Sequence, residues 1–270
     1  MKIKTISLDT KTTIDITLEE PAAREAFFIF GIHKSGSSLL NKLFVETCRI
    51  LDIPSIPIPE FAFHQGISLE DWDNCSALNS VILDGYCHRG YRTFPLFLKD
   101  NELLQKRKKI LLVRDPRDAI VSAYFSFAKS HTLPETGNLL NDMLEVRKNL
   151  SNMELENFAI AQATNVKEAF DCYHRYLPHD SNLKIYRYED VIFDKKTWMQ
   201  DMLNFLNLNL REIQIIRMAK QQDVIPKKEK PSKHIRKVTP GDHKEKLSAE
   251  CIDKLNHILA EVLERHGYEF

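Results

Sequence analysis

Glycine is scarce in this sequence: only 8 of its 270 residues are glycine, so a cluster of glycines marks a turn with special backbone geometry. Net charge is also missing, because 38 lysines and arginines balance 38 aspartates and glutamates. This balance argues against electrostatic capture of nucleic acid or of an anionic membrane as the main function. The richest apolar run, residues 26–32, is far too short to span a membrane. The sequence therefore predicts a globular protein with neither kind of partner.

Metal, redox and secretion motifs are lacking as well. The five cysteines form no Cys-x-x-Cys pair, so we expect them to be small buried side chains in a reducing compartment. The ten histidines form no ligand cluster, since even His174 and His179 have a spacing that fits no single helix face. The first residues do not have the apolar stretch and cleavage site of a signal peptide. We expect a cytoplasmic protein without a metal site.

Strand-like runs alternate with helix-like segments along most of the chain. Apolar runs at 27–30, 109–113 and 183–188 each lead through a short polar loop into a segment with helical spacing, the second of these over residues 119–128. A last helix is expected over residues 247–265. This alternation predicts an α/β fold, a P-loop-like three-layer α/β/α arrangement with a central, mostly parallel sheet. Such sheets bind ligands at the carboxyl ends of their strands.

The two flanking regions have different patterns. Residues 2–18 alternate apolar and polar side chains around Asp9-Thr10-Lys11, which is typical of a β-hairpin. Residues 224–246 are basic, poor in apolar side chains and interrupted by prolines, which indicates a mobile surface segment. We expect residues 1–270 to form a single domain, with the hairpin occupying residues 1–20.

The first strand–helix unit contains a loop with the spacing of a phosphate-binding loop. Gly31 and Gly36 lie between strand and helix, where backbone N–H groups and the helix N-terminus can bind phosphate oxygens. Ser37 occupies the position of the lysine in an ATPase loop, whereas Lys34 lies inside the loop. No aspartate is distinctive as a Mg²⁺ ligand either. The pattern predicts an anion site rather than an ATPase, and an ordinary strand–helix turn stays open as the alternative.

Two further stretches could bind anions at the same edge of the sheet. Arg114 ends the second strand, and Ser122 follows in the next helix. The alternative is a turn in which Arg114 and Arg117 pair with the neighbouring aspartates. Arg236 and Lys237 form a third basic site, for which a solvated loop is the alternative.

Taken together and in this order, the three stretches resemble the nucleotide site of sulfotransferases that use 3′-phosphoadenosine 5′-phosphosulfate (PAPS). The family's 5′-phosphosulfate loop, commonly Lys-Ser-Gly-Thr-Thr, is similar to Lys34-Ser35-Gly36-Ser37-Ser38. Its 3′-phosphate motif, Arg-x-Pro-x-Asp with a serine following, is similar to Arg114-Asp115-Pro116-Arg117-Asp118 with Ser122. Its C-terminal elements are similar to Arg236-Lys237 and Gly241-Asp242-His243-Lys244. Leu39, Val238 and His243 depart from the family by replacing a tryptophan, a glycine and a second tryptophan.

The resemblance implies an enzyme that moves a sulfuryl group from PAPS to a hydroxyl or amine of a small-molecule acceptor by in-line displacement. Adenosine 3′,5′-bisphosphate (PAP) would be released, no metal would be needed, and the segment 224–246 would close over the nucleotide. The cofactor-binding residues it implies are His33, Lys34, Ser35, Gly36, Ser37, Ser38, Arg114, Ser122, Tyr188, Arg236 and Lys237.

Three residues are candidates for catalysis. Lys34 is suited to neutralise charge on the leaving phosphate. His88 and Glu60 are equal candidates for the base that removes the acceptor's proton, because family members use either a histidine or a glutamate in comparable regions. The acceptor pocket is expected from the loop-rich residues 60–95 and from residues 131–150.

Two other functions stay open from the sequence. A P-loop kinase acting on a small molecule would need Mg²⁺-dependent ATP binding, although Ser37 stands in the lysine position. A non-catalytic protein that binds nucleotides or polyanions could use the basic segment at residues 227–237. The oligomeric state cannot be inferred from the sequence.

Overall fold

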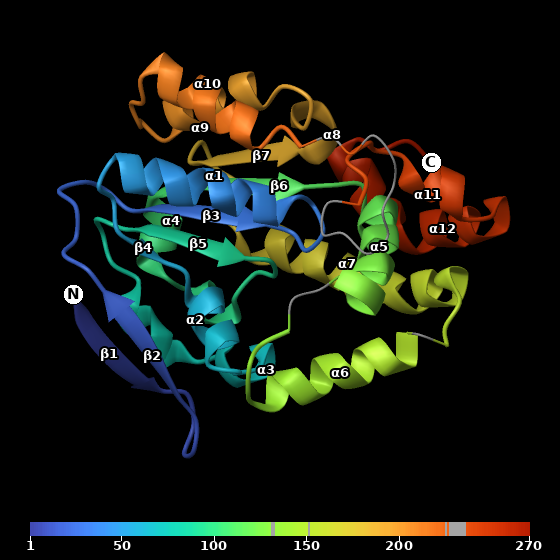
Figure 1. The fold of residues 1–270 in the computed structure, drawn as a ribbon, viewed down its shortest axis with the longest axis horizontal. Helices are drawn as coiled ribbons and strands as arrows, with labels where there is room; N and C mark the ends of the chain where they lie inside the picture. The colour runs from blue at the N-terminus through green and yellow to red at the C-terminus, as the bar shows by residue number, and fades with distance from the viewer. Residues whose placement is uncertain (131–132, 151, 225, 227–235) are drawn as a thin grey trace.

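The described residues of this computed structural model, 1–130, 133–150, 152–224, 226 and 236–270, alternate between strands and helices (Figure 1). The strands are β1 Lys2–Ser7, β2 Thr13–Leu18, β3 Phe27–Gly31, β4 Ser55–Ile56, β5 Cys87–Tyr91, β6 Lys108–Val113 and β7 Leu183–Arg187. The α-helices are α1 Ser37–Ile50, α2 Ile58–His64, α3 Leu69–Trp72, α4 Glu102–Lys106, α5 Pro116–Phe125, α6 Asn138–Leu150, α7 Leu155–Tyr176, α8 Tyr188–Val191, α9 Lys195–Phe205, α10 Glu212–Gln221, α11 Asp242–Lys246 and α12 Ala249–His266. Shorter helical segments are η1 Ser76–Val81, η2 Leu96–Leu98 and the π-helix η3 Ser126–Ser130.

Strands β3 to β7 form a parallel sheet of five strands in the order β4-β5-β3-β6-β7. The central strand β3 is buried along its whole length, which explains its continuous apolar run. The α/β class and the mostly parallel sheet predicted from the sequence are confirmed. Because the strands run in one direction, the segments that follow β3, β5, β6 and β7 meet at one edge.

The two faces of β3 point into separate cores. Phe28 and Phe30 pack with residues of α7, α2 and β2, whereas Phe27 and Ile29 pack with residues of α1, α9 and α10. Figure 1 shows α1, α9 and α10 along one face of the sheet and α7 along the other. Burial of each such side chain stabilises the fold by about 1.5–3 kcal/mol. The three-layer arrangement is therefore also as predicted. No helix of the described residues is long and apolar enough to cross a membrane.

The predicted hairpin is present as β1 and β2, and it braces helix α2. The two strands pair antiparallel from Lys2↔Leu18 to Ser7↔Thr13. The backbone of Asp15 forms two hydrogen bonds with the side-chain amide of Gln65, which ends α2, at 2.8 and 2.9 Å. The position of α2 thus depends on contacts with the N-terminal strands.

Two expectations about local structure were wrong. Residues 60–95 are less loop-rich than expected, because they contain most of α2 and the whole of α3, η1 and β5. Strand β5 was missed because its sequence, Cys-His-Arg-Gly-Tyr, has polar residues where a buried strand usually has apolar ones. The described part of the basic segment, 236–246, is not a mobile surface loop: Arg236, Asp242 and His243 are buried. The rest of that segment, apart from 224 and 226, lies outside the described residues.

Two backbone segments pass close to each other at Gly66 and Gly137, just before α6. Gly66 and Gly137 both have left-handed backbones, with φ angles of 69° and 89°. The amide of Leu139 donates a hydrogen bond to the carbonyl of Gly66 at 3.4 Å. The crossing fixes the start of α6 against the turn between α2 and α3.

We expect Gly66→Ala to destabilise the protein more than Gly267→Ala. Gly267 has a similar φ angle, 66°, so a left-handed alanine costs about 1–2 kcal/mol at either position. A Cβ at Gly66 would lie 2.1 Å from the carbonyl oxygen of Thr136, whereas at Gly267 the nearest atom is a guanidinium nitrogen of Arg187 at 3.5 Å. Urea unfolding of both variants measures the difference. Equal losses of stability would show that the close crossing is not formed.

Candidate functional site

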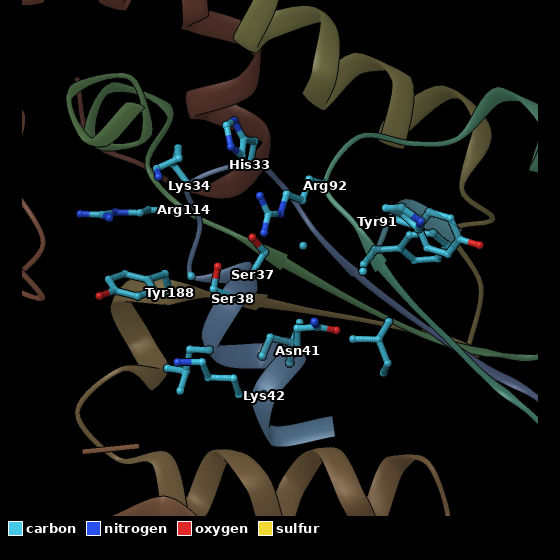
Figure 2. Close-up of a pocket in the computed structure, with 18 of the residues that line it drawn as sticks. His33, Lys34, Ser37, Ser38, Asn41, Lys42, Tyr91, Arg92, Arg114 and Tyr188 are labelled. Carbon is cyan, nitrogen blue, oxygen red and sulfur yellow. The ribbon is translucent and has the colours of Figure 1, made fainter. Parts of the chain in front are cut away.

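A cavity of about 640 Å³ lies at the carboxyl edge of the sheet, between the loop after β3, the start of α1 and the end of β5. Figure 2 shows Lys34, Arg92 and Arg114 around Ser37 and Ser38, which begin α1. The residues lining it that matter for the chemistry are His33, Lys34, Gly36, Ser37, Ser38, Asn41, Glu60, Tyr91, Arg92, Arg114, Ser122, Tyr188 and Lys237.

The loop between β3 and α1 is closed by its own hydrogen bonds. The Ser35 hydroxyl lies 2.5 Å from the carbonyl oxygen of Ile32 and 3.0 Å from that of Leu112, so it ties the loop to β6. Gly36 has a φ angle of 91°, and a Cβ there would lie 2.9 Å from the Tyr188 ring. Only glycine fits this position. The closed loop leaves the N-terminal amides of α1 available at the cavity, where they favour an anion.

Lys34 has both an unusual backbone conformation and an altered charge equilibrium. Its backbone is left-handed, with a φ angle of 65°, a conformation that is unusual for a residue with a side chain. The pKa of its amine is lowered to about 8, chiefly by burial. Three neighbouring cations, Arg92, Arg114 and Arg236, add to this effect. A bound anion would relieve both penalties, so the site is built to receive negative charge.

Arg114 lies at the end of β6, where the sequence placed it. Its guanidinium stacks on the Tyr188 ring at 4.6 Å, and one terminal nitrogen lies 3.3 Å from Asp118. Its Nε is buried and has no hydrogen-bond partner in the described part of the chain. The aspartate pairing offered as an alternative is therefore also present, with Arg117 on Asp115 at 2.7 Å. The pairing leaves donors of Arg114 unused, because Asp118 engages only one end of the guanidinium fork.

The C-terminal segment reaches the same edge of the sheet. Arg236 is buried with its guanidinium over the Phe125 ring at 4.3 Å, and it pairs with Asp242. Lys237 lines the cavity, but its ammonium contacts Asp242 at 3.2 Å and Glu245 at 2.6 Å. The Tyr188 hydroxyl donates to the carbonyl oxygen of Val238 at 2.9 Å, which holds this segment against α8.

Glu60 lies on α2 and lines the cavity as well. Its Oε1 accepts hydrogen bonds from Arg89 at 2.8 Å and from Asn41 at 2.5 Å. These two donors come from β5 and α1, so three elements fix one carboxylate. Its side chain is 39% exposed, and it faces the cavity.

His88 is not brought to the cavity. It is the second residue of β5 and has no exposed surface. Its ring stacks on Phe28 at 4.9 Å, and its Nε2 lies 2.9 Å from the carbonyl oxygen of Leu83. Burial lowers its pKa to about 4. The side chain therefore packs in the core, and it faces away from the residues that gather around Lys34.

Most of the residues suggested by the sequence meet at the cavity. His33, Lys34, Gly36, Ser37, Ser38, Arg114, Ser122, Tyr188, Lys237 and Glu60 line it. Ser35 supports the loop from behind, and Arg236 acts through its charge on Lys34. Residues 60–93 contribute one wall, whereas none of the described residues 133–150 does. Across the described residues, no group of three His, Cys, Asp or Glu side chains is arranged to hold a metal ion.

Arg92 was missed by sequence reasoning. It follows β5, its side chain enters the cavity, and burial lowers its pKa while Glu60 opposes that shift (Figure 2). Asn41 and Arg89, which hold Glu60, were missed as well. Arg92 belongs to no sequence motif. It could have been predicted only from its place directly after a strand that ends at Tyr91, and that strand was not recognised in the sequence.

Comparison with known proteins gives a family and a fold. A family model described as the sulfotransferase domain matches residues 24–267. No curated protein matches the chain. The mouse sulfotransferase SULT7A1 complexed with PAP has 16% identity and a TM-score of 0.55, over 90% of this chain and 85% of that one. Retinol dehydratase with androsterone and inactive cofactor PAP has 16% identity and a TM-score of 0.53, over 88% and 80%. The complex of retinol dehydratase with retinol and PAP has 18% identity and a TM-score of 0.53, over 88% of this chain and 81% of that one.

We expect the Lys34 amine to titrate near pH 8, and Arg92→Gln to raise that midpoint because one repelling cation is removed. The titration can be followed by NMR after ¹³C-methylation of the lysines, with Lys34→Met identifying the signal. A midpoint near the ordinary lysine value of about 10.4 in both proteins would show that the cations do not share a buried site.

Proposed function

Because this chain belongs to the sulfotransferase domain family and is an enzyme of PAPS-dependent sulfuryl transfer, we propose that its acceptor is a hydroxyl or amine of a small molecule. The observation that carries the proposal is that the carboxylate of Glu60 and the apolar side chains of Phe63 and Trp72 line the same cavity as Lys34. We include residues 1–270 as one catalytic domain in this proposal. A cytoplasmic location also belongs to it, since all five cysteines are free, as in a reducing compartment.

The residues present fit a donor with phosphates at two ends. Lys34, Arg92 and Arg114 line the cavity, and the buried Nε of Arg114 has no partner within the described residues. A phosphate oxygen is a suitable acceptor for that N–H, and arginine binds phosphates through such forked contacts. Bound there, PAPS would supply the sulfuryl group, and its 5′-phosphate would be the leaving group as part of PAP.

We assign the two ends of the donor to two groups of residues. The amides and hydroxyls of Ser37 and Ser38 at the start of α1 are suited to the 5′-phosphosulfate. Arg114 and Ser122, together with the charge of Arg236, are suited to the 3′-phosphate. The 14-residue helix α1 adds the favourable field of its N-terminus to the first group.

Lys34 and Arg92 are suited to neutralise charge during transfer. An ammonium inside the loop can hydrogen-bond the oxygen that becomes anionic as the leaving group departs. In the free protein part of the Lys34 population is neutral above pH 8, so donor binding at that pH takes up a proton. Arg92 enters from β5 and is suited to hold the sulfuryl oxygens from the acceptor side.

Glu60 is the base in this proposal. Arg89 and Asn41 both bond its Oε1, which leaves Oε2 to accept the acceptor's proton. Its place in the wall of the cavity supports the assignment, whereas His88 has no path to a ligand there. Proton removal late in the transfer needs only a modest base, because the acceptor oxygen becomes acidic as its bond to sulfur forms.

The acceptor wall supports a substrate with an apolar body. Phe63, Leu69, Trp72 and Tyr91 line the cavity beside Glu60. The retinol dehydratase structures contain androsterone and retinol, which are hydroxylated apolar molecules, and that precedent agrees with a wall of this kind.

Calorimetric titration tests the donor. We expect PAP to bind without Mg²⁺ and Arg114→Gln to weaken it about 10–100-fold, because charge-assisted hydrogen bonds contribute about 1.5–3 kcal/mol. Arg49→Gln is the control, since Arg49 lies on the surface and pairs with Glu46. Binding of Mg²⁺–ATP with no binding of PAP would favour the kinase alternative, and binding of heparin alone would favour a polyanion-binding protein.

Turnover tests the base. Using ³⁵S-labelled PAPS and a panel of hydrophobic alcohols, phenols and amines, we expect Glu60→Gln to lower turnover about 10²–10⁴-fold. Its affinity for PAP should stay unchanged. His88→Gln, which keeps a donor for the Leu83 carbonyl, should retain the turnover of the parent. Loss of turnover in His88→Gln with full turnover in Glu60→Gln would show that His88 is the base.

A further inference from the structure

Asp118 is a buried carboxylate with an unusual number of donors. It has no exposed surface, and it accepts hydrogen bonds from the amide of Gly241 at 2.7 Å and from the amide of His243 at 2.9 Å. The His243 ring nitrogen Nδ1 contacts it at 2.7 Å, and Arg114 at 3.3 Å. Four donors from two distant parts of the chain therefore meet at one side chain.

The charge of this carboxylate is retained in the folded protein. Burial alone would raise the pKa of Asp118, but the hydrogen bond from His243 and the charge of Arg114 outweigh it and hold the pKa well below its usual range. Since a carboxylate only accepts hydrogen bonds, the His243 Nδ1 must carry the proton. The ring is thereby fixed in one tautomer and one orientation.

The contacts of Asp118 join the two halves of the cationic site. Arg114 follows β6, whereas Gly241 precedes the short helix α11 and His243 lies in its first turn. Asp242 of the same helix pairs with Arg236. Asp118 lies on α5, which is held in place because it packs against α7 and α12 in a third hydrophobic core. Any displacement of Asp118 would move Arg114 and the segment 236–243 apart.

We propose that Asp118 and His243 are positioning residues that set the separation of Arg114 and Arg236, and so create the preference for a nucleotide with a 3′-phosphate. Neither residue lines the cavity, so each acts through the arginines. The proposal rests on the proposed function, because it assumes that these arginines face the 3′-phosphate. His243 is central to it, since a substitution can remove its side-chain donor to Asp118 without altering the backbone or the two arginines.

Two substitutions of His243 separate positioning from packing. His243→Asn keeps an N–H near the place of Nδ1, whereas His243→Phe fills the space without a donor. Calorimetry with PAP and with AMP, which has no 3′-phosphate, gives the affinity ratio for each protein. We expect His243→Phe to lose about tenfold in PAP affinity while AMP affinity stays the same, and His243→Asn to recover most of the loss.

Amide hydrogen exchange supplies a second measurement. The amides of Gly241 and His243 donate to Asp118, so they should exchange faster in His243→Phe and not in His243→Asn. If the phenylalanine variant keeps the PAP-to-AMP ratio of the parent, or weakens both ligands equally, the positioning role is refuted. If the parent itself binds PAP no better than AMP, the assignment of the 3′-phosphate site fails first.

Discussion

Three arginines, Arg92, Arg114 and Arg236, add to the effect of burial on the charge of Lys34, and this gathering of cations at one edge of the sheet is the constraint around which the site is organised. Charges that repel must be held in place by something else. Carboxylates from other elements do this: Asp118 holds Arg114, and Asp242 holds Arg236. Asp118 engages one end of the Arg114 guanidinium, and the buried Nε of that side chain has no hydrogen-bond partner in the described part of the chain.

The parallel sheet makes this concentration of charge possible. Lys34 follows β3, Arg92 follows β5 and Arg114 follows β6, and these strands are neighbours. Parallel strands deliver their following residues to one edge, although the three are far apart in sequence. The buried interiors of the strands supply the rigidity that holds the cations together, since apolar burial on both faces fixes the register.

Local patterns allowed the loop at Gly31–Ser38 and the position of Arg114 to be predicted, because strand, turn and helix follow one another directly there. The position of His88 could not be inferred in this way. Whether a residue in a short strand faces a core or a ligand depends on its partner strand, and β5 was not recognised. Arg92 was overlooked for the same reason. The pairing of Lys237 with Glu245 depends on the fold of α11, which a basic composition does not indicate.

The hairpin β1–β2 lies outside the region that the family model matches, which begins at residue 24. It nevertheless contacts α2 through the hydrogen bonds between Asp15 and Gln65, and α2 carries Glu60, which lines the cavity. The wall of the cavity that contains Glu60 therefore depends on a hairpin outside the matched region, although α2 itself lies inside it. A change in the hairpin would reach that wall through α2.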